Sequence, residues 1–168
     1  NLVEEAIAHG FNSFTKDILV KQFATLTLYQ YDFKGYYAGI DSMAAYYKHN
    51  MELLEKDVRD ELFGARDIYT KVRDSAPSKY GEEAVVKNSL ISDGCVIEGV
   101  VENSILFRGV KVGKGAVVKN SVLFQDTYVC EGAQLNCVIT DKNVVIKDGR
   151  VLSGHETMPF YIGKKMSV

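Results

Sequence analysis

A repeated pattern between residues 85 and 151 constrains the fold more than any other feature of the sequence. A unit of Asn, a small residue and two aliphatic residues occurs four times, at intervals of 15, 17 and 16 residues, at 88–91, 103–106, 120–123 and 136–139. Such fixed self-similarity is typical of a solenoid, in which each coil buries its apolar residues against the next coil. The sequence therefore predicts a stack of coils.

A six-residue period lies beneath this repeat and predicts which side chains face inward. The first positions of the hexads are Val85, Ile91, Ile97, Leu106, Val112, Val118, Phe124, Val129 and Leu135. The fifth positions are Ser89, Cys95, Val101, Val110, Ala116, Val122, Ala133 and Ile139. We expect a short strand and a turn per hexad and about 18 residues per three-sided coil, which gives roughly three to four coils. An antiparallel sandwich of short strands is the alternative, but the strict register favours the solenoid.

Residues 1–84 differ in composition from the repeat. They hold 13 of the 18 Phe and Tyr residues but only 4 of the 20 Val residues. Alternation predicts a strand over 25–33, with Tyr29, Tyr31 and Phe33 on one side. Two kinds of structure are therefore joined in one chain.

The spacing of apolar residues predicts three helices in the first part of the chain. They are a helix over 1–9 that ends at Gly10, a helix from an N-cap at Asp41 or Ser42 to about Leu54, and a short helix over about 56–63. These elements are too few for a complete α/β domain, so we interpret them as the tail of a larger one.

Composition narrows the class of protein. No run reaches the roughly 20 apolar residues that a membrane span needs, and no basic-then-apolar leader opens the chain. The net charge of −2 argues against a nucleic-acid partner. Cys95, Cys130 and Cys137 form no C-x-x-C pair, so we expect packed thiols in a reducing compartment. These features predict a soluble cytoplasmic protein without membrane or nucleic-acid partners.

Five features occur along the chain: F-T-K-D-I-L at 14–19, G-Y-Y-A-G-I-D-S at 35–42, N-M-E-L-L at 50–54, the segment 68–70 with Pro77, and the Asn-containing repeat. With these motifs the chain resembles the C-terminal part of the glucose-1-phosphate adenylyltransferases, the ADP-glucose pyrophosphorylases of glycogen and starch synthesis. Within that family it resembles most the bacterial D-type companion subunits of glycogen biosynthesis. The second motif is similar to the family's G-Y-W-x-D-V-G-T.

The resemblance implies a mainly β fold: a left-handed parallel β-helix of hexapeptide repeats, preceded by an α/β segment that is the tail of a nucleotidyltransferase domain. The expected parts are 1–63 as the end of that domain, 64–84 as a linker, 85–152 as the β-helix and 153–168 as a capping tail. The handedness is taken from the resemblance, since the pattern itself does not contain it.

In catalytic members of the family, the Asp of G-Y-W-x-D-V-G-T holds the Mg²⁺ that bridges the nucleotide and sugar phosphates. Gly39 stands at that position, and glycine offers no ligand. Asp41, two residues on, is expected to cap the following helix. The family's nucleotide loop, G-G-x-G-[ST]-R-L, is absent from these residues. The resemblance thus implies no catalytic residue, metal site or cofactor in this chain, and no ADP-glucose synthesis by the chain alone.

A basic stretch suggests regulation. Catalytic relatives bind anionic sugar-phosphate effectors through a segment resembling F-S-R-V-R-V, and residues 107–112 read F-R-G-V-K-V. Arg108, Lys111, Lys114 and Lys119 are the charged residues between 107 and 125, and all are positive, which favours a bound phosphate. A solvated basic face that keeps the coil soluble is the alternative, and it stays open.

The sequence thus predicts the regulatory and oligomerisation portion of a noncatalytic adenylyltransferase-like subunit. Its expected partners are further copies of itself, a catalytic subunit, or both, because the ends of a short solenoid expose strand edges. The alternatives are the tail of another sugar-nucleotide pyrophosphorylase and a hexapeptide acyltransferase. His9, His49 and His155 lie outside the hexads, so an acyltransferase base would have only His155 in the tail as a remote candidate.

Overall fold

The computed structural model describes residues 2–64, 68–70 and 72–168. Residues 65–67 and 71 of the predicted linker lie outside this range. The chain divides into two compact units, residues 1–34 and 35–168. The unit 1–34 contains the helix α1 (Leu2–Ala8) and the π-helical segment η1 (Phe14–Val20). Gly10 follows α1 with a φ of 72°, which confirms the predicted helix and its glycine end.

The segment η1 was not predicted from the sequence. Its start is held by Asp17, whose carboxylate accepts the backbone N–H groups of Asn12 and Ser13 at 3.2 and 3.1 Å. Lys21 donates to the same carboxylate at 2.7 Å. This ammonium first, and then the two N–H groups, hold the pKa of Asp17 below its usual value. The N-cap is Ser13, whose hydroxyl oxygen accepts the N–H of Lys16 at 3.2 Å, so the capping signal was present just before the F-T-K-D-I-L motif.

The predicted strand over 25–33 is wrong. The described residues of this segment form neither a helix nor a strand, and no strand of the described chain pairs with them. Tyr29 and Tyr31 are 91% and 85% exposed, and Phe33 is 62% exposed. Alternation favours an extended segment, but a strand also needs a partner for its N–H and C=O groups.

Three helical segments open the unit 35–168. They are α2 (Met43–Glu52), α3 (Lys56–Arg59) and the π-helical η2 (Asp60–Gly64). The two predicted helices are thereby confirmed, the second as a short α-helix that widens into a π-helical turn. Ser42 is the N-cap of α2, since its side chain accepts the N–H of Ala45 at 3.1 Å. Asp41 therefore does not cap the helix.

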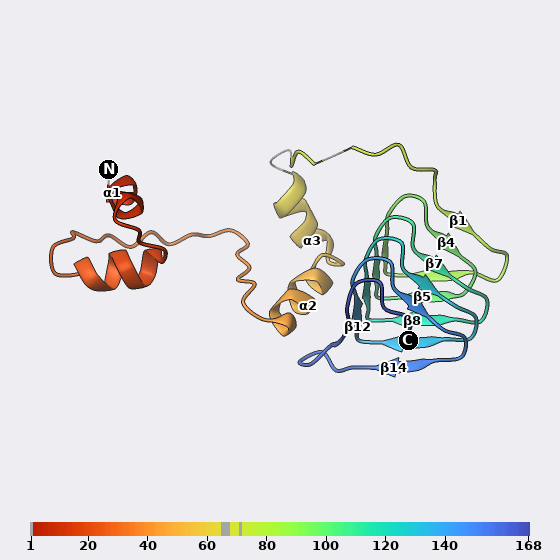
Figure 1. The fold of residues 1–168 in the computed structure, drawn as a ribbon. Helices are drawn as coiled ribbons and strands as arrows, with labels where there is room; N and C mark the ends of the chain where they lie inside the picture. The colour runs from red at the N-terminus through yellow and green to blue at the C-terminus, as the bar shows by residue number, and fades with distance from the viewer. Residues whose placement is uncertain (1, 65–67, 71) are drawn as a thin grey trace. The chain divides into compact units, whose positions relative to one another are not determined.

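The rest of the chain is a parallel β-solenoid with three five-stranded sheets, as predicted (Figure 1). The first sheet contains β1 (Lys79–Tyr80), β4 (Val96–Ile97), β7 (Lys111–Val112), β10 (Tyr128–Val129) and β13 (Val145–Ile146). The second contains β2 (Val85–Lys87), β5 (Val100–Glu102), β8 (Val117–Lys119), β11 (Gln134–Asn136) and β14 (Val151–Ser153). The third contains β3 (Leu90–Ile91), β6 (Ile105–Leu106), β9 (Val122–Leu123), β12 (Val138–Thr140) and β15 (Phe160–Ile162). Each coil adds one strand to each sheet.

The core is a column of aliphatic side chains inside the coils. In the first sheet it runs through Ile97, Val112, Val129 and Ile146, each at most 1% exposed. Parallel register stacks equivalent residues of successive coils, so each side chain is covered above and below by its counterparts. This burial, rather than the short strands themselves, stabilises the fold.

Several inward positions differ from the predicted hexads. Val86, and not Val85, packs against the core, while Val85 is 40% exposed. In β9, Leu123 faces the core, whereas Val122 and Phe124 belong to a separate cluster that includes helix residues. Adjacent residues of a strand point to opposite faces, so only one of each pair can point inward.

The fourth copy of the repeat begins one residue later than predicted. Ile139 pairs with Val122, so Cys137 rather than Asn136 occupies the position of Asn120. Cys137 accordingly has a φ of 52°, the left-handed conformation of the corner. Ile139 therefore lies beside Val122 on the outer face of the third sheet, and Thr140 occupies the position of Leu123.

The corner geometry explains why Asn and Ser recur. The positive φ angles of 41°, 46° and 46° fall at Asn88, Asn103 and Asn120, and Asn tolerates this conformation better than most residues. The serines that follow join the coils. The hydroxyl oxygen of Ser89 accepts the N–H of Ser104 at 3.1 Å, and that of Ser104 accepts the N–H of the next coil's serine at 3.1 Å.

Candidate functional site

Helix α2 lies on the outer face of the third sheet, and this interface is the most structured feature outside the core (Figure 1). The sheet's outward row is aliphatic, with Ile105, Val122 and Ile139 at 7%, 0% and 2% exposure. Tyr46, Tyr47, Met51, Leu53 and Leu54 from the helical segment cover it. The sequence carried this signal, because two adjacent aliphatic residues in each copy of the repeat indicate a sheet that is buried on both faces.

Tyr47 is the central contact of this interface. Its side chain is 3% exposed, and its hydroxyl donates to the backbone C=O of Asn120 at 2.6 Å. Burial raises the pKa of Tyr47 above its ordinary value, so the phenol stays protonated and remains a donor. A backbone carbonyl at a coil corner is thereby satisfied by a helix side chain.

A row of three aromatic rings runs across the same interface. The rings of Tyr46 and Phe124 meet edge to face with centroids 6.3 Å apart, and those of Phe124 and Phe107 lie 4.7 Å apart. Such arrangements suit the ring quadrupoles. We call these residues the aromatic row. It connects α2 to the ends of β9 and β6.

A polar cluster ties the segment before α2 to the helix. The Tyr36 hydroxyl donates to Glu52 at 2.6 Å, and Nδ1 of His49 lies 2.8 Å from the same carboxylate oxygen. The bond to Glu52 raises the pKa of Tyr36 to about 12 and lowers that of Glu52. The backbone N–H of Tyr36 also donates to Glu61. Tyr36, three residues before Gly39, is thus held to the C-terminal end of α2 and to η2.

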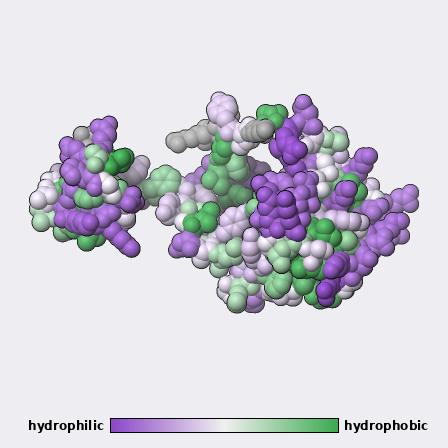
Figure 2. Space-filling view, in the orientation of Figure 1, coloured by the Kyte–Doolittle hydropathy of each residue, from purple (hydrophilic) through white to green (hydrophobic). Residues whose placement is uncertain are grey.

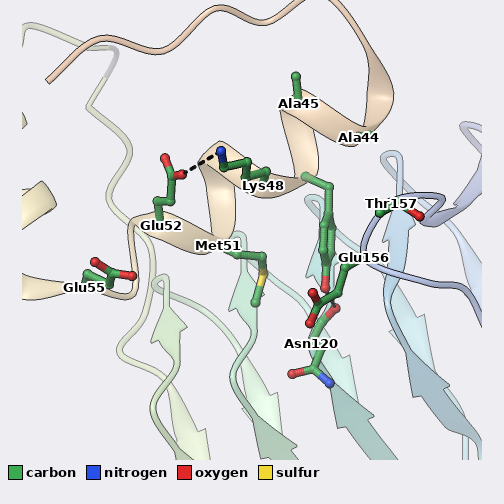
Figure 3. A pocket seen from close by; sticks show the side chains of 10 residues that line it. Ala44, Ala45, Lys48, Met51, Glu52, Glu55, Asn120, Glu156 and Thr157 are labelled. Atoms are coloured by element: carbon green, nitrogen blue, oxygen red, sulfur yellow. Dashed lines mark hydrogen bonds and ion pairs between the residues drawn. The ribbon is translucent and has the colours of Figure 1, made fainter.

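Two grooves flank α2. The first encloses about 580 Å³, with Ala44, Ala45 and Lys48 on the helix side and Asn120 and Glu156 on the solenoid side (Figure 3). Three carboxylates line it, those of Glu52, Glu55 and Glu156, against the single ammonium of Lys48. This ammonium lies 3.8 Å from Glu52.

The second groove encloses about 540 Å³ and is lined by the aromatic rings of Tyr46, Phe124 and Tyr161 together with Asp41 and Asp141. Neither groove contains Arg108, Lys111, Lys114 or Lys119. Because carboxylates outnumber cations in both, neither groove suits a phosphate anion.

The four predicted effector residues lie in the turn between β6 and β7, in β7, in the turn after β7 and in β8. Lys114 lies in the turn after β7 and lines a small pocket together with Glu82, Glu83 and Glu98. Lys119, at the end of β8, lies 2.9 Å from Glu102 and lowers the pKa of that carboxyl. Hydrophilic residues gather along the right-hand edge of the solenoid in Figure 2, where the coils turn. Two of the four cations therefore already face carboxylates of the chain itself.

Arg108 and Lys111 lie closer together. Arg108 is half-buried in the turn between β6 and β7, and Lys111 is the exposed first residue of β7. Neither forms an ion pair with another of the described residues. Lys114 likewise forms no ion pair within the described residues but lines a pocket with three glutamates, whereas neither Arg108 nor Lys111 lines that pocket or either groove.

Gly39 is exposed and lies just before α2. A Cβ added there would meet nothing nearer than the Tyr37 hydroxyl at 3.9 Å, so the space for an aspartate exists although the ligand does not. Within the described residues no three His, Cys, Asp or Glu side chains gather as metal ligands would. Gly39 offers no side-chain ligand at the position that the resemblance assigns to a metal-binding Asp.

The remaining sequence candidates are distributed over the structure. Cys95 and Cys137 are buried, Cys130 is half-buried, and all three are unpaired thiols. His155 is exposed on the turn between β14 and β15, with Nδ1 3.0 Å from the Thr157 hydroxyl. Among the described helices, none has the length and apolar character required to cross a membrane.

A parallel solenoid of short strands, with inward columns that repeat from coil to coil, defines the class of hexapeptide-repeat proteins. The chain belongs to the GlmU-like C-terminal hexapeptide family, whose model matches residues 74–157. This match covers the repeat and the turns that flank it.

Curated relatives confirm the predicted resemblance. The glycogen biosynthesis protein GlgD of Bacillus subtilis is 47% identical over 150 residues, which are 89% of this chain and 44% of that protein. GlgD of Geobacillus stearothermophilus is 62% identical over 69 residues, 40% of this chain and 20% of that protein. The glucose-1-phosphate adenylyltransferase of the same organism is 34% identical over 117 residues, 68% of this chain and 30% of that protein. The chain spans less than half the length of these relatives.

Proposed function

We propose that this chain is the C-terminal, noncatalytic and regulatory portion of a glucose-1-phosphate adenylyltransferase-like subunit that serves ADP-glucose synthesis for glycogen. The observation that carries the proposal is the extent of the similarity to GlgD, which covers 89% of the chain and includes α2 and the segment before it. The similarity to glucose-1-phosphate adenylyltransferase, at 34% identity, supports the substrate class.

Gly39 supports the noncatalytic part of the proposal. Phosphoryl transfer between a nucleotide and a sugar phosphate depends on a metal that neutralises the developing charge. The position of the family's metal-binding Asp has no side-chain oxygen here, and Asp41 lines a groove with only one other carboxylate, that of Asp141, which falls short of the three clustered ligands absent from the described residues. The missing carboxylate would lie just before helix α2, which packs on the solenoid.

The proposal divides the chain into 1–63 as the end of a nucleotidyltransferase-like domain, 64–84 as the linker, 85–152 as the β-helix and 153–168 as its capping tail. Backbone bonds support the cap. The N–H groups of Val145 and Lys147 donate to Met166 and Val168 at 2.9 and 2.8 Å, so the tail covers the last strand of the first sheet. Strands β1, β2 and β3 are the edge strands at the other end and pair on that side with no strand of the described residues; we propose that further copies or a catalytic subunit cover them.

We further propose Arg108 and Lys111 as the phosphate-binding residues, with Lys114 and Lys119 in the wider basic face. The Arg108→Ala/Lys111→Ala variant of the full-length subunit should raise the half-saturating concentration of a sugar phosphate about 10-fold or more, because each charge-assisted bond contributes about 1.5–3 kcal/mol. The measurement is ADP-glucose synthesis by the complex with the catalytic subunit, titrated with fructose 1,6-bisphosphate.

The matched control for that variant is Lys147→Ala/Lys164→Ala, which removes the same charge from two other exposed positions of the solenoid. A similar shift in both variants would show that the effect comes from the overall charge of the protein and not from a site at Arg108 and Lys111. An unchanged response to fructose 1,6-bisphosphate in the first variant would leave only the solvated-face interpretation.

A further inference from the structure

We propose that the aromatic row, Tyr46, Phe124 and Phe107, is a positioning element that transmits the state of Arg108 to helix α2. This inference rests on the proposed function, because it names the route by which an anion at Arg108 would reach the helix that follows Gly39. Its parts come from three separate places in the chain, α2 and the ends of β9 and β6.

The end of the row at Phe107 is fixed to the turn that carries Arg108. The N–H of Phe107 donates to Leu123 at 2.9 Å, and its C=O accepts the thiol of Cys95 at 3.2 Å. The C=O of Arg108 accepts the N–H of Asp126 at 3.0 Å. These bonds tie the Phe107–Arg108 turn to the adjacent coil and to Cys95, and the proposed route starts with a shift of this turn, together with the Phe107 ring, when an anion binds Arg108.

Phe124, the middle ring of the aromatic row, links the displacement of Phe107 to Tyr46. Phe124 lies in the adjacent coil, and its ring is the one that meets both other rings. All three rings are half-buried and pack against the cluster between the sheet and the helix. In the proposed route, a displacement of the Phe107 ring reaches Tyr46 through Phe124.

The far end of the row lies on the helix that follows Gly39. Tyr46 is in the first half of α2, four residues after the N-cap Ser42. The Tyr36 bond to Glu52 holds the segment before Gly39 to the same helix. A shift of α2 thus moves this segment, which in the proposed subunit lies at the junction with the nucleotidyltransferase-like part.

Contact continuity does not by itself establish energetic coupling, so the test measures coupling directly. The test variant is Phe124→Leu, which keeps an apolar side chain but removes the ring at the centre of the row. The matched control is Tyr47→Phe, which weakens the same interface by removing the bond to Asn120 and leaves all three rings in place. Both are made in the full-length subunit and assayed with the catalytic subunit.

We expect Phe124→Leu to change the half-saturating fructose 1,6-bisphosphate concentration about 2- to 30-fold, the range found for residues along coupling networks. Tyr47→Phe should lower the melting temperature and leave that concentration unchanged. A structural role of the interface alone would affect the response equally in both variants and would overturn the inference.

The outcomes separate the inference from the function on which it rests. If the wild-type subunit alters the effector response of its partner and Phe124→Leu alters it identically, the coupling route is wrong and the proposed function stands. If the wild-type subunit has no effect on the partner at any effector concentration, both are wrong.

Discussion

Replacing Gly99 with alanine is expected to destabilise the solenoid by about 3 kcal/mol, near the upper end of what overpacking usually costs. Gly99 is buried, and an added Cβ would lie within van der Waals overlap of two backbone oxygens, those of Ala116 at 2.3 Å and Gly113 at 2.7 Å. Neither oxygen can move away without displacing the backbone of the neighbouring coil. The Ala116 oxygen accepts the N–H of Val100 at 2.8 Å, so moving it breaks a bond between coils.

The free energy of unfolding in urea measures this effect. The control is Gly39→Ala, where the nearest atom would be 3.9 Å away and no positive φ opposes a side chain. That variant should stay within about 0.5 kcal/mol of the wild type. Equal stability of the two variants would mean that the coils are not packed as closely at Gly99 as the structure has them.

Replacing Tyr47 with alanine is expected to release α2 from the third sheet, at a cost of about 3–5 kcal/mol for a buried aromatic residue. Two losses combine. The side chain is 3% exposed and packs on the aliphatic outer row of the sheet, and the Asn120 carbonyl loses the donor that satisfies it. Hydrogen exchange is the appropriate measurement, because it resolves α2 from the coils.

In the Tyr47→Ala variant, the amides of α2 should exchange about 100-fold faster or more, while those of β6 and β9 stay protected. Tyr37→Ala is the control, since that side chain is 82% exposed. Unchanged protection of α2 in the Tyr47→Ala variant would show that the helix is held by something other than this interface.

The solenoid could be predicted from the sequence because its determinants are local. Each coil repeats the same corner conformation, and Asn at 88, 103 and 120 supplies the positive φ that the corner needs. The N-cap at Ser42 and the glycine after α1 follow from equally local chemistry. Such features depend on neighbouring residues alone and therefore appear as spacing.

The errors arise where distant parts of the chain meet. Phe124 and Val122 were assigned to the core because a period of six does not reveal that a helix covers the outside of one sheet. The fourth copy of the repeat is shifted by one residue because Cys137 adopts the corner conformation in place of an asparagine.

The candidate site was only partly predictable for the same reason. Charge alone grouped Arg108 and Lys111 with Lys114 and Lys119, but the fold places glutamates beside the last two. The aromatic row consists of residues from three segments, so no spacing in the sequence brings it together. The two adjacent aliphatic residues in each copy of the repeat were the sequence signal that the outer face of the third sheet is covered.

The central claim is that the subunit containing this chain regulates ADP-glucose synthesis without performing it. The most direct measurement is ADP-glucose formation by three purified samples in Mg²⁺ and a range of fructose 1,6-bisphosphate: the full-length subunit, a catalytic glucose-1-phosphate adenylyltransferase subunit, and the two after co-expression. We predict no synthesis by the first sample, co-purification of the two chains, and an altered rate or effector response of the pair. Synthesis by the full-length subunit alone would contradict the claim, as would a subunit that neither co-purifies with the catalytic chain nor changes its response.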